Sequence, residues 1–146
     1  GSISRNLPGP CKMKLEGEPR WVRKQAILIL HAMSLEIHGG LPGVRDEGLL
    51  DSALARPLQV FSYGDPLPDL AALAAAYAVG IARNHPFVDG NKRAALTCLG
   101  QMLNKNGYDL TANDADTYQA MMALAAGTLL QDDLADWIRA NSAPLT

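Results

Sequence analysis

The sequence predicts an all-α protein built around one core. Apolar residues recur every three or four positions through most of the chain, which is the spacing that gives a helix one buried face. Glycines and prolines stand mainly between these periodic stretches, where they end helices. The chain has 146 residues, of which 48% are hydrophobic and 19% are charged. This is enough for one globular domain and too little for two full ones.

The first twelve residues are expected to lie outside that domain. Gly1 and Ser2 resemble the remnant of a removed tag, and Met13 is a candidate for the natural start. We therefore expect residues 1–12 to be a disordered, vector-derived segment. Residues 13–146 are expected to form a single domain.

Charge and cysteine content narrow the function classes. The formal net charge is -2, from 13 Lys and Arg against 15 Asp and Glu, which argues against a surface that binds nucleic acid directly. Cys11 and Cys98 are too few for a disulfide framework, and Cys98 lies in an apolar helical pattern that predicts a buried, inert thiol. No secretion signal and no apolar run of ~20 residues is visible, so we expect a cytoplasmic protein without a membrane segment.

The first half of the domain is predicted to hold two helices and one extended segment. Residues 21–37 carry the helical spacing, and the glycine-rich run 39–43 ends it. A shorter helix is expected over residues 47–55, because Pro57 stops it. Residues 58–63 alternate loosely and contain β-branched and aromatic side chains, so we interpret them as a small hairpin or flap.

Residues 69–84 form the clearest predicted helix. Asp69 can cap its first turn, and Pro86 forces an end at about His85. Its many alanines permit close packing on all sides, which is typical of a central helix.

Three further helices are expected toward the C-terminus. One covers residues 91–106 with Gly107 as its C-terminal cap residue, and the next runs from Thr111 or Asn113 through Ala126 and is closed by Gly127. Residues 128–131 fit a capping box for a last helix, which is predicted to bury four apolar side chains: Leu130, Leu134, Trp137 and Ile138.

The residues that can carry chemistry lie where the central helix ends and the next helix begins. A helix N-terminus presents unpaired N–H groups and partial positive charge, and Gly90 lets the backbone approach an anion. Lys92 and Arg93 oppose the helix dipole there, an arrangement that an arriving phosphate would relieve. Asp89 offers a hard oxygen ligand for Mg²⁺, and His85 offers a general base. Together they indicate phosphoryl or nucleotidyl transfer.

Other interpretations of these features remain to be weighed. Taken singly, a histidine before a proline, an Asp-Gly-Asn turn and a Lys-Arg pair are more often structural, and only their conjunction favours a site. His31 and His38 are seven residues apart without a completing carboxylate cluster, so we interpret them as ordinary, partly exposed residues. A helix-turn-helix DNA binder is the non-enzyme alternative, although a basic recognition helix is lacking.

The same run of residues resembles the signature of the Fic/Doc family, written H-x-F-x-[DE]-G-N-x-R. It reads His85-Pro86-Phe87-Val88-Asp89-Gly90-Asn91-Lys92-Arg93. The resemblance extends upstream to the glycine-rich run 39–43, to residues 48–50 and to residues 82–84, which are similar to Doc-type toxins. It covers most of the chain, from about residue 27 to residue 137.

This resemblance implies a compact bundle of about six helices with a β-hairpin flap over the active site, which residues 58–63 would form. It implies that His85 is the catalytic base, that Phe87 is a buried anchor and that Asp89 holds Mg²⁺. The nucleotide phosphates of ATP would be bound by four residues of the signature, with Arg83 as a further candidate: Gly90, Asn91, Lys92 and Arg93.

Two positions favour the Doc-type branch. The AMP-transferring branch of the family reads G-N-G-R-x-x-R, whereas this chain has Lys92 in place of the second glycine and Leu96 in place of the last arginine. The resemblance therefore implies a protein kinase that transfers the ATP γ-phosphoryl group to a Ser or Thr hydroxyl of a translation factor. Its implied target is elongation factor Tu, and the transfer would arrest translation. An adenylyltransferase and a catalytically silent interaction module remain the alternatives.

A partner follows from the same resemblance. Doc-type toxins are restrained by an antitoxin whose C-terminal segment is disordered when free and folds on binding to the toxin. We expect such an antitoxin here.

Overall fold

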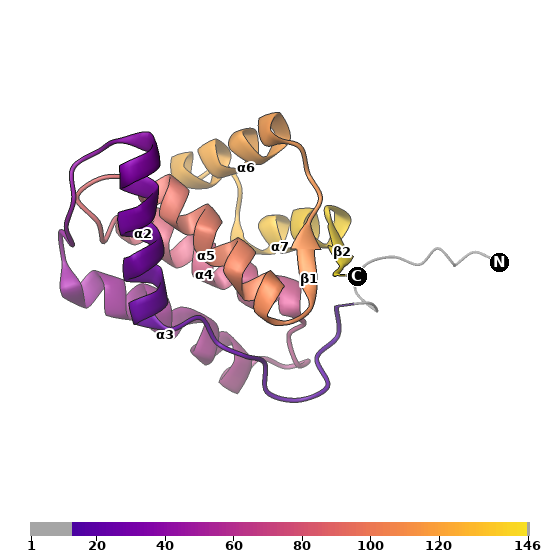
Figure 1. The fold of residues 1–146 in the computed structure, drawn as a ribbon. Helices are drawn as coiled ribbons and strands as arrows, with labels where there is room; N and C mark the ends of the chain where they lie inside the picture. The colour runs from indigo at the N-terminus through magenta and orange to yellow at the C-terminus, as the bar shows by residue number, and fades with distance from the viewer. Residues whose placement is uncertain (1–12, 146) are drawn as a thin grey trace.

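The computed structural model describes residues 13–145, and in that range the chain forms six helices and one two-stranded antiparallel sheet (Figure 1). The predicted all-α class is confirmed. The expectation for residues 1–12, Cys11 included, concerns a segment outside this range. The elements are α2 (Lys24–His38), α3 (Glu47–Tyr63), α4 (Leu70–Asn84), α5 (Asn91–Lys105), β1 (Tyr108–Leu110), α6 (Asp114–Ala126), α7 (Gln131–Ala140) and β2 (Ser142–Pro144).

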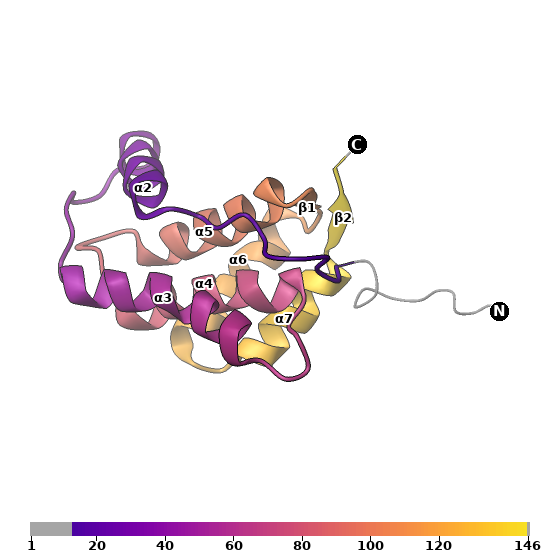
Figure 2. The same ribbon diagram turned by 90° about the horizontal axis from the view of Figure 1, so that it is seen from below.

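Helix α4 is the centre of the molecule, as its alanine-rich sequence predicts. From Leu70 to Ala82 every residue except Ala72 is buried, and α3, α5 and α7 pack around it (Figure 2). Small side chains allow this close approach. At Gly80, an added Cβ would lie 3.0 Å from the backbone of Ala53 on α3, so a larger residue would push the two helices apart.

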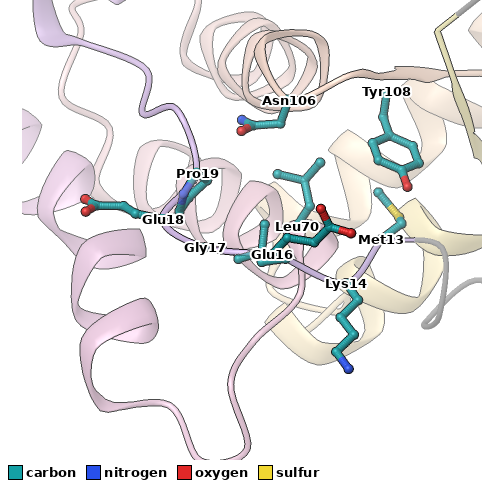
Figure 3. Close-up of a pocket in the computed structure, with 10 residues that line it drawn as sticks. Met13, Lys14, Glu16, Gly17, Glu18, Pro19, Leu70, Asn106 and Tyr108 are labelled. Carbon is teal, nitrogen blue, oxygen red and sulfur yellow. The ribbon is translucent and has the colours of Figure 1, made fainter.

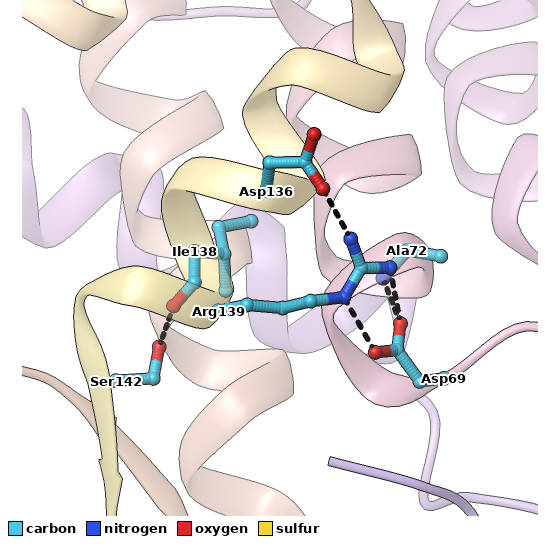
Figure 4. Close-up of polar contacts among 6 residues, drawn as sticks. All are labelled: Asp69, Ala72, Asp136, Ile138, Arg139 and Ser142. Carbon is cyan, nitrogen blue, oxygen red and sulfur yellow. Dashed lines mark hydrogen bonds and ion pairs between the residues drawn. The ribbon is translucent and has the colours of Figure 1, made fainter. Parts of the chain in front are cut away.

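The N-terminus of α4 is tied to α7 through Asp69. The Asp69 carboxylate accepts a hydrogen bond from Ala72 N at 2.9 Å, which confirms the predicted cap. It also pairs with Arg139, whose Nε and Nη2 donate to it at 2.7 Å and 2.9 Å (Figure 4). These hydrogen bonds to the Asp69 carboxylate raise the pKa of Arg139 above its usual value. At the end of α7, the Ser142 hydroxyl donates to the Ile138 carbonyl at 2.6 Å.

Two buried titratable groups lie in the core, one on α4 and one on α5. The Tyr77 hydroxyl accepts from Val22 N at 3.0 Å and donates to Val22 O at 3.3 Å, which fixes the segment before α2. Burial raises the pKa of Tyr77 to about 12. Burial likewise raises the pKa of the Cys98 thiol, which is fully enclosed on α5, as predicted for an inert core residue.

Helix α3 corrects the prediction of a flap over residues 58–63. The helix begins after Asp46, which accepts from Leu49 N at 2.9 Å, and it continues through Pro57 to Tyr63. A proline removes one helical hydrogen bond, but here packing outweighs that loss. Pro57 itself is buried, and the Phe61 ring meets Trp21 edge-on with centroids 5.6 Å apart. The small sheet of β1 and β2 lies at the other end of α5 from the turn after α4 (Figure 1).

The start of α7 also differs from the expected capping box over residues 128–131. Thr128 Oγ1 donates to Ala123 O at 3.2 Å, so this side chain closes α6 instead of opening α7. Helix α7 begins at Gln131, and only the Asp133 carboxylate reaches back, accepting from Leu130 N at 3.4 Å. The predicted burial is right for Leu134 and Ile138, partial for Trp137 and wrong for Leu130, which is 56% exposed.

Candidate active site

The turn between α4 and α5 is built on two residues with left-handed backbone. His85 ends α4 with φ 49 and ψ 56, and Gly90 precedes α5 with φ 76 and ψ 25. Glycine adopts this conformation freely, whereas for a histidine it is uncommon and needs support from its surroundings. The chain therefore reverses within a few residues, and the two helices run back along each other (Figure 1).

Phe87 anchors this turn in the core, as the sequence predicts. It is 1% exposed, and its ring stacks on His31 of α2 with centroids 3.8 Å apart. The Asn91 side chain closes the turn from inside, because it accepts from Phe87 N at 2.9 Å and donates to Phe87 O at 3.0 Å. The amide of Asn91 is thus committed to the backbone of the turn, and its side chain has a structural task besides the predicted contact with phosphate.

His31 corrects the interpretation of the two histidines of α2. His31 is 6% exposed, and its Nε2 lies 2.8 Å from the carbonyl oxygen of Asp89. A carbonyl oxygen only accepts, so Nε2 carries the proton and donates. His31 therefore holds the backbone of the turn at Asp89, while His38 is exposed, as expected.

The connection between α2 and α3 packs against the turn. Val44 forms an antiparallel bridge with Phe87, and Val88 N donates to Gly43 O at 3.0 Å. Leu41 N donates to the Asp89 carboxylate at 3.2 Å. At Gly40, a Cβ would come within 3.0 Å of the same carboxylate, so a side chain there would displace Asp89.

Arg45, in the same connection, holds the end of α4. Its Nε donates to His85 O at 2.7 Å and its Nη2 donates to Asn84 O at 2.9 Å. Its backbone N–H donates to Pro86 O at 2.7 Å. The last carbonyls of a helix have no partner within the helix, and a cation is favoured at that end. No local sequence pattern marked Arg45, because its partners lie about forty positions away along the chain.

A cavity of about 740 Å³ opens beside this turn, between the end of α2, the start of α5 and one face of α6. Arg83 does not line it and instead lies exposed in the last turn of α4. Six of the predicted site residues line it: His85, Asp89, Gly90, Asn91, Lys92 and Arg93.

Helix α6 supplies a wall of the cavity that sequence reasoning missed. Its lining residues are Asp114, Thr117, Tyr118, Met121 and Met122. The sequence predicted this helix from the residues at its two ends, and no motif within it indicates a ligand.

The electrostatics at the start of α5, on one side of the cavity, favour an anion. Lys92 and Arg93 are exposed in the first turn of α5, and none of the ion pairs found among residues 13–145 involves them. The N–H groups of this first turn have no partner within the helix and carry partial positive charge. A phosphate group would satisfy the side chains and the N–H groups together.

Asp89 fits a role as a magnesium ligand that shares the ion with a substrate. Its carboxylate is exposed in the cavity, and each oxygen accepts only one backbone N–H, from Leu41 and Gly90, so lone pairs stay free. In the described part of the chain, no three His, Cys, Asp or Glu side chains gather as a metal cage. Mg²⁺ is often held by one carboxylate together with substrate phosphates, which matches this arrangement.

Comparison with known proteins places this site in a family. The model of the Fic/DOC family matches residues 21–103, which include α2 to α4, the whole turn and α5 as far as Leu103. The chain belongs to the Fic/DOC family. It is 46% identical over 96 residues to "Toxin Doc" of Mycolicibacterium smegmatis, which covers 64% of this chain and 72% of the relative. It is 29% identical over 120 residues to "Protein kinase doc" of Escherichia phage P1, which covers 82% of this chain and 94% of the relative.

A second cavity, of about 590 Å³, lies away from the Fic/DOC signature. It is formed by residues 13–19 together with Leu70, Asn106 and Tyr108 (Figure 3). None of the predicted site residues lines it.

Among residues 13–145, no helix is both long and apolar enough to cross a membrane.

Proposed function

We propose that this Fic/DOC protein is a Doc-type toxin, a protein kinase that transfers the γ-phosphoryl group of ATP to a Ser or Thr hydroxyl of elongation factor Tu and so arrests translation. The observation that carries the proposal is that His85, Asp89 and the first turn of α5 line one cavity. A base, a magnesium ligand and an anion site are the parts that phosphoryl transfer needs in one place.

Each residue has a separate task in the proposed transfer. Lys92, Arg93 and the N–H groups at the start of α5 bind the phosphates. Asp89 would hold Mg²⁺, which supplies neutralisation of the phosphate charge when bound. His85 accepts the proton of the acceptor hydroxyl. The hydroxyl oxygen bonds to the γ-phosphorus, the bond from that phosphorus to the β–γ bridging oxygen breaks, and ADP leaves.

Lys92 and Leu96 favour γ-phosphoryl transfer over AMP transfer. The AMP-transferring branch of the family has a glycine and an arginine at these two positions. Both residues line the cavity, so the structure has a cation where that branch leaves space and an apolar side chain where it has a phosphate clamp. The similarity to "Protein kinase doc" supports the same choice.

The deciding experiment follows the label from ATP. Purified protein is incubated with elongation factor Tu, Mg²⁺ and ATP labelled at the γ- or the α-phosphate. Label is expected from the γ-position only, and His85→Ala is expected to abolish it while leaving the fold intact, because His85 is exposed. Label from the α-position alone would instead identify an adenylyltransferase, and no label from either would favour a silent module.

The toxin role also predicts a partner and a growth phenotype. Three apolar side chains of α2, at spacings of four residues, are largely exposed: Ile29 at 60%, Met33 at 51% and Ile37 at 74%. Such a stripe suits the apolar face of a partner segment that folds on binding, as proposed for the antitoxin. Induced expression of this chain without an antitoxin is expected to slow bacterial growth, and expression of His85→Ala at the same level is not. Equal growth of the two cultures would contradict the toxin role.

A further inference from the structure

We propose that Arg45 is a positioning residue that sets the direction of the His85 imidazole by holding the peptide groups on both sides of it. The proposal rests on the proposed role of His85 as the base. Arg45 does not line the cavity, so it would act through His85 and not on a substrate.

The contacts of Arg45 surround His85 on the backbone. The guanidinium donates to the carbonyl oxygens of Asn84 and His85 at 2.9 Å and 2.7 Å, and the Arg45 backbone N–H donates to that of Pro86 at 2.7 Å. Three successive carbonyl groups are therefore bound by a single residue. This leaves the peptide planes before and after His85 little freedom to rotate.

His85 needs this support because its backbone conformation is unfavourable for a histidine. Its φ of 49 lies in the left-handed region, and the residue is exposed, so side-chain packing does not hold it. The backbone bond from His85 N to Ile81 O, at 3.2 Å, fixes only the helical side. On the opposite side, the His85 carbonyl is held by the Arg45 guanidinium, and the Pro86 carbonyl is shared by the backbone N–H groups of Arg45 and Asp46.

Lysine cannot replace this arginine. The two carbonyl oxygens are met by two different nitrogens of one planar guanidinium, whereas an ammonium is a point donor on a flexible stem. Lysine would keep the positive charge near the end of α4 but would lose the fixed geometry. The pair Arg45→Lys and Arg45→Ala therefore separates charge from geometry.

Arg56 on α3 provides the matched control. It is also exposed, and its Nε donates to a single partner, Gln131 Oε1, at 2.8 Å, away from the turn. Arg56→Ala is expected to leave transfer unchanged. Because the carbonyls held by Arg45 are close to solvent, water can bind them in the variants, and we expect these to fold.

The experiment measures catalysis and the state of His85 separately. For Arg45→Ala and Arg45→Lys we expect kcat for labelled phosphate transfer to fall about tenfold, with the KM for ATP changed by less than about twofold. Added guanidinium ion at a non-denaturing concentration is expected to restore part of the kcat of Arg45→Ala. In NMR spectra the His85 Cε1–H resonance should shift and broaden in both variants and stay in place in Arg56→Ala.

The outcomes are distinguishable. An unchanged His85 resonance in both Arg45 variants overturns the positioning role, as does an unchanged kcat in an active protein. A fall of kcat that only follows the fraction of unfolded protein overturns it as well. If the wild-type protein transfers nothing, the proposed function has failed, and the His85 resonance alone decides whether Arg45 positions this residue.

Discussion

The turn between α4 and α5 has an inner and an outer side that differ in almost every respect. On the inner side, Phe87 and Asn91 are buried and bound to other parts of the protein. On the outer side, His85, Asp89 and Lys92 are exposed and line the cavity. Residues that are neighbours in sequence thus face opposite environments.

The difference teaches that stability and chemistry are divided within one short segment. The inner side chains determine the path of the backbone, because their contacts are fixed by packing and hydrogen bonds. The outer side chains are left free for a ligand, since exposed groups contribute little to the free energy of unfolding. Substitutions on the inner side should therefore change stability first, and substitutions on the outer side should change transfer first.

The largest expected effect on stability is that of Phe87→Ala. It removes a ring that is 1% exposed and stacked on His31, so it leaves a cavity in the core beside α2. We expect a loss of about 3–5 kcal/mol in the free energy of unfolding, measured by urea titration. The neighbouring Val88 is 47% exposed, and Val88→Ala should cost less than about 0.5 kcal/mol. Similar losses for the two variants would contradict the division.

A smaller loss is expected for Asn91→Ala. The substitution leaves the N–H and the C=O of the buried Phe87 without their partners, which costs about 2 kcal/mol in the free energy of unfolding. Asn104, exposed on the same helix, gives the matched substitution, and Asn104→Ala should change stability by less than about 0.5 kcal/mol. If Asn91→Ala lowers transfer but leaves the urea midpoint in place, Asn91 belongs with the outer side.

Much of this fold follows from local patterns in the sequence. The helices α4, α5 and α6 begin and end within a few residues of their predicted bounds, because apolar spacing, Asp69, Asn113 and Gly127 act over a single turn of helix. The predicted site residues from His85 to Arg93 lie together because they are close in sequence. Their roles in transfer remain proposals.

What the sequence could not reveal depends on contacts between distant segments. The end of α3 was predicted as a flap, but the packing of Phe61 on Trp21 and the burial of Pro57 keep it helical. The burial of His31 could not be inferred without knowing that it stacks on Phe87, which is 1% exposed. The hydrogen bonds from Arg45 to the end of α4 join residues that are far apart along the chain, so no local sequence pattern marks them.

The smallest expected effect concerns Gly90, which stands between the inner and outer sides. Its φ is 76, and an added Cβ would meet its nearest neighbour, His31 Nε2, at 3.5 Å, which is an ordinary contact. The cost of Gly90→Ala therefore comes from the backbone alone. We expect about 1 kcal/mol of destabilisation in urea titration, which is the usual penalty for an alanine with left-handed backbone.

Gly100 supplies a control of opposite sign for the same substitution. It lies inside α5, an added Cβ there meets nothing within 4 Å, and its backbone is helical. Gly100→Ala should stabilise the protein by about 0.5–1 kcal/mol, because alanine loses less backbone entropy on folding than glycine. If Gly90→Ala lowers the free energy of unfolding by much more than a strained backbone explains, the added methyl group disturbs His31 and, through it, the carbonyl of Asp89. Gly90 would then belong to the inner side, together with Phe87 and Asn91.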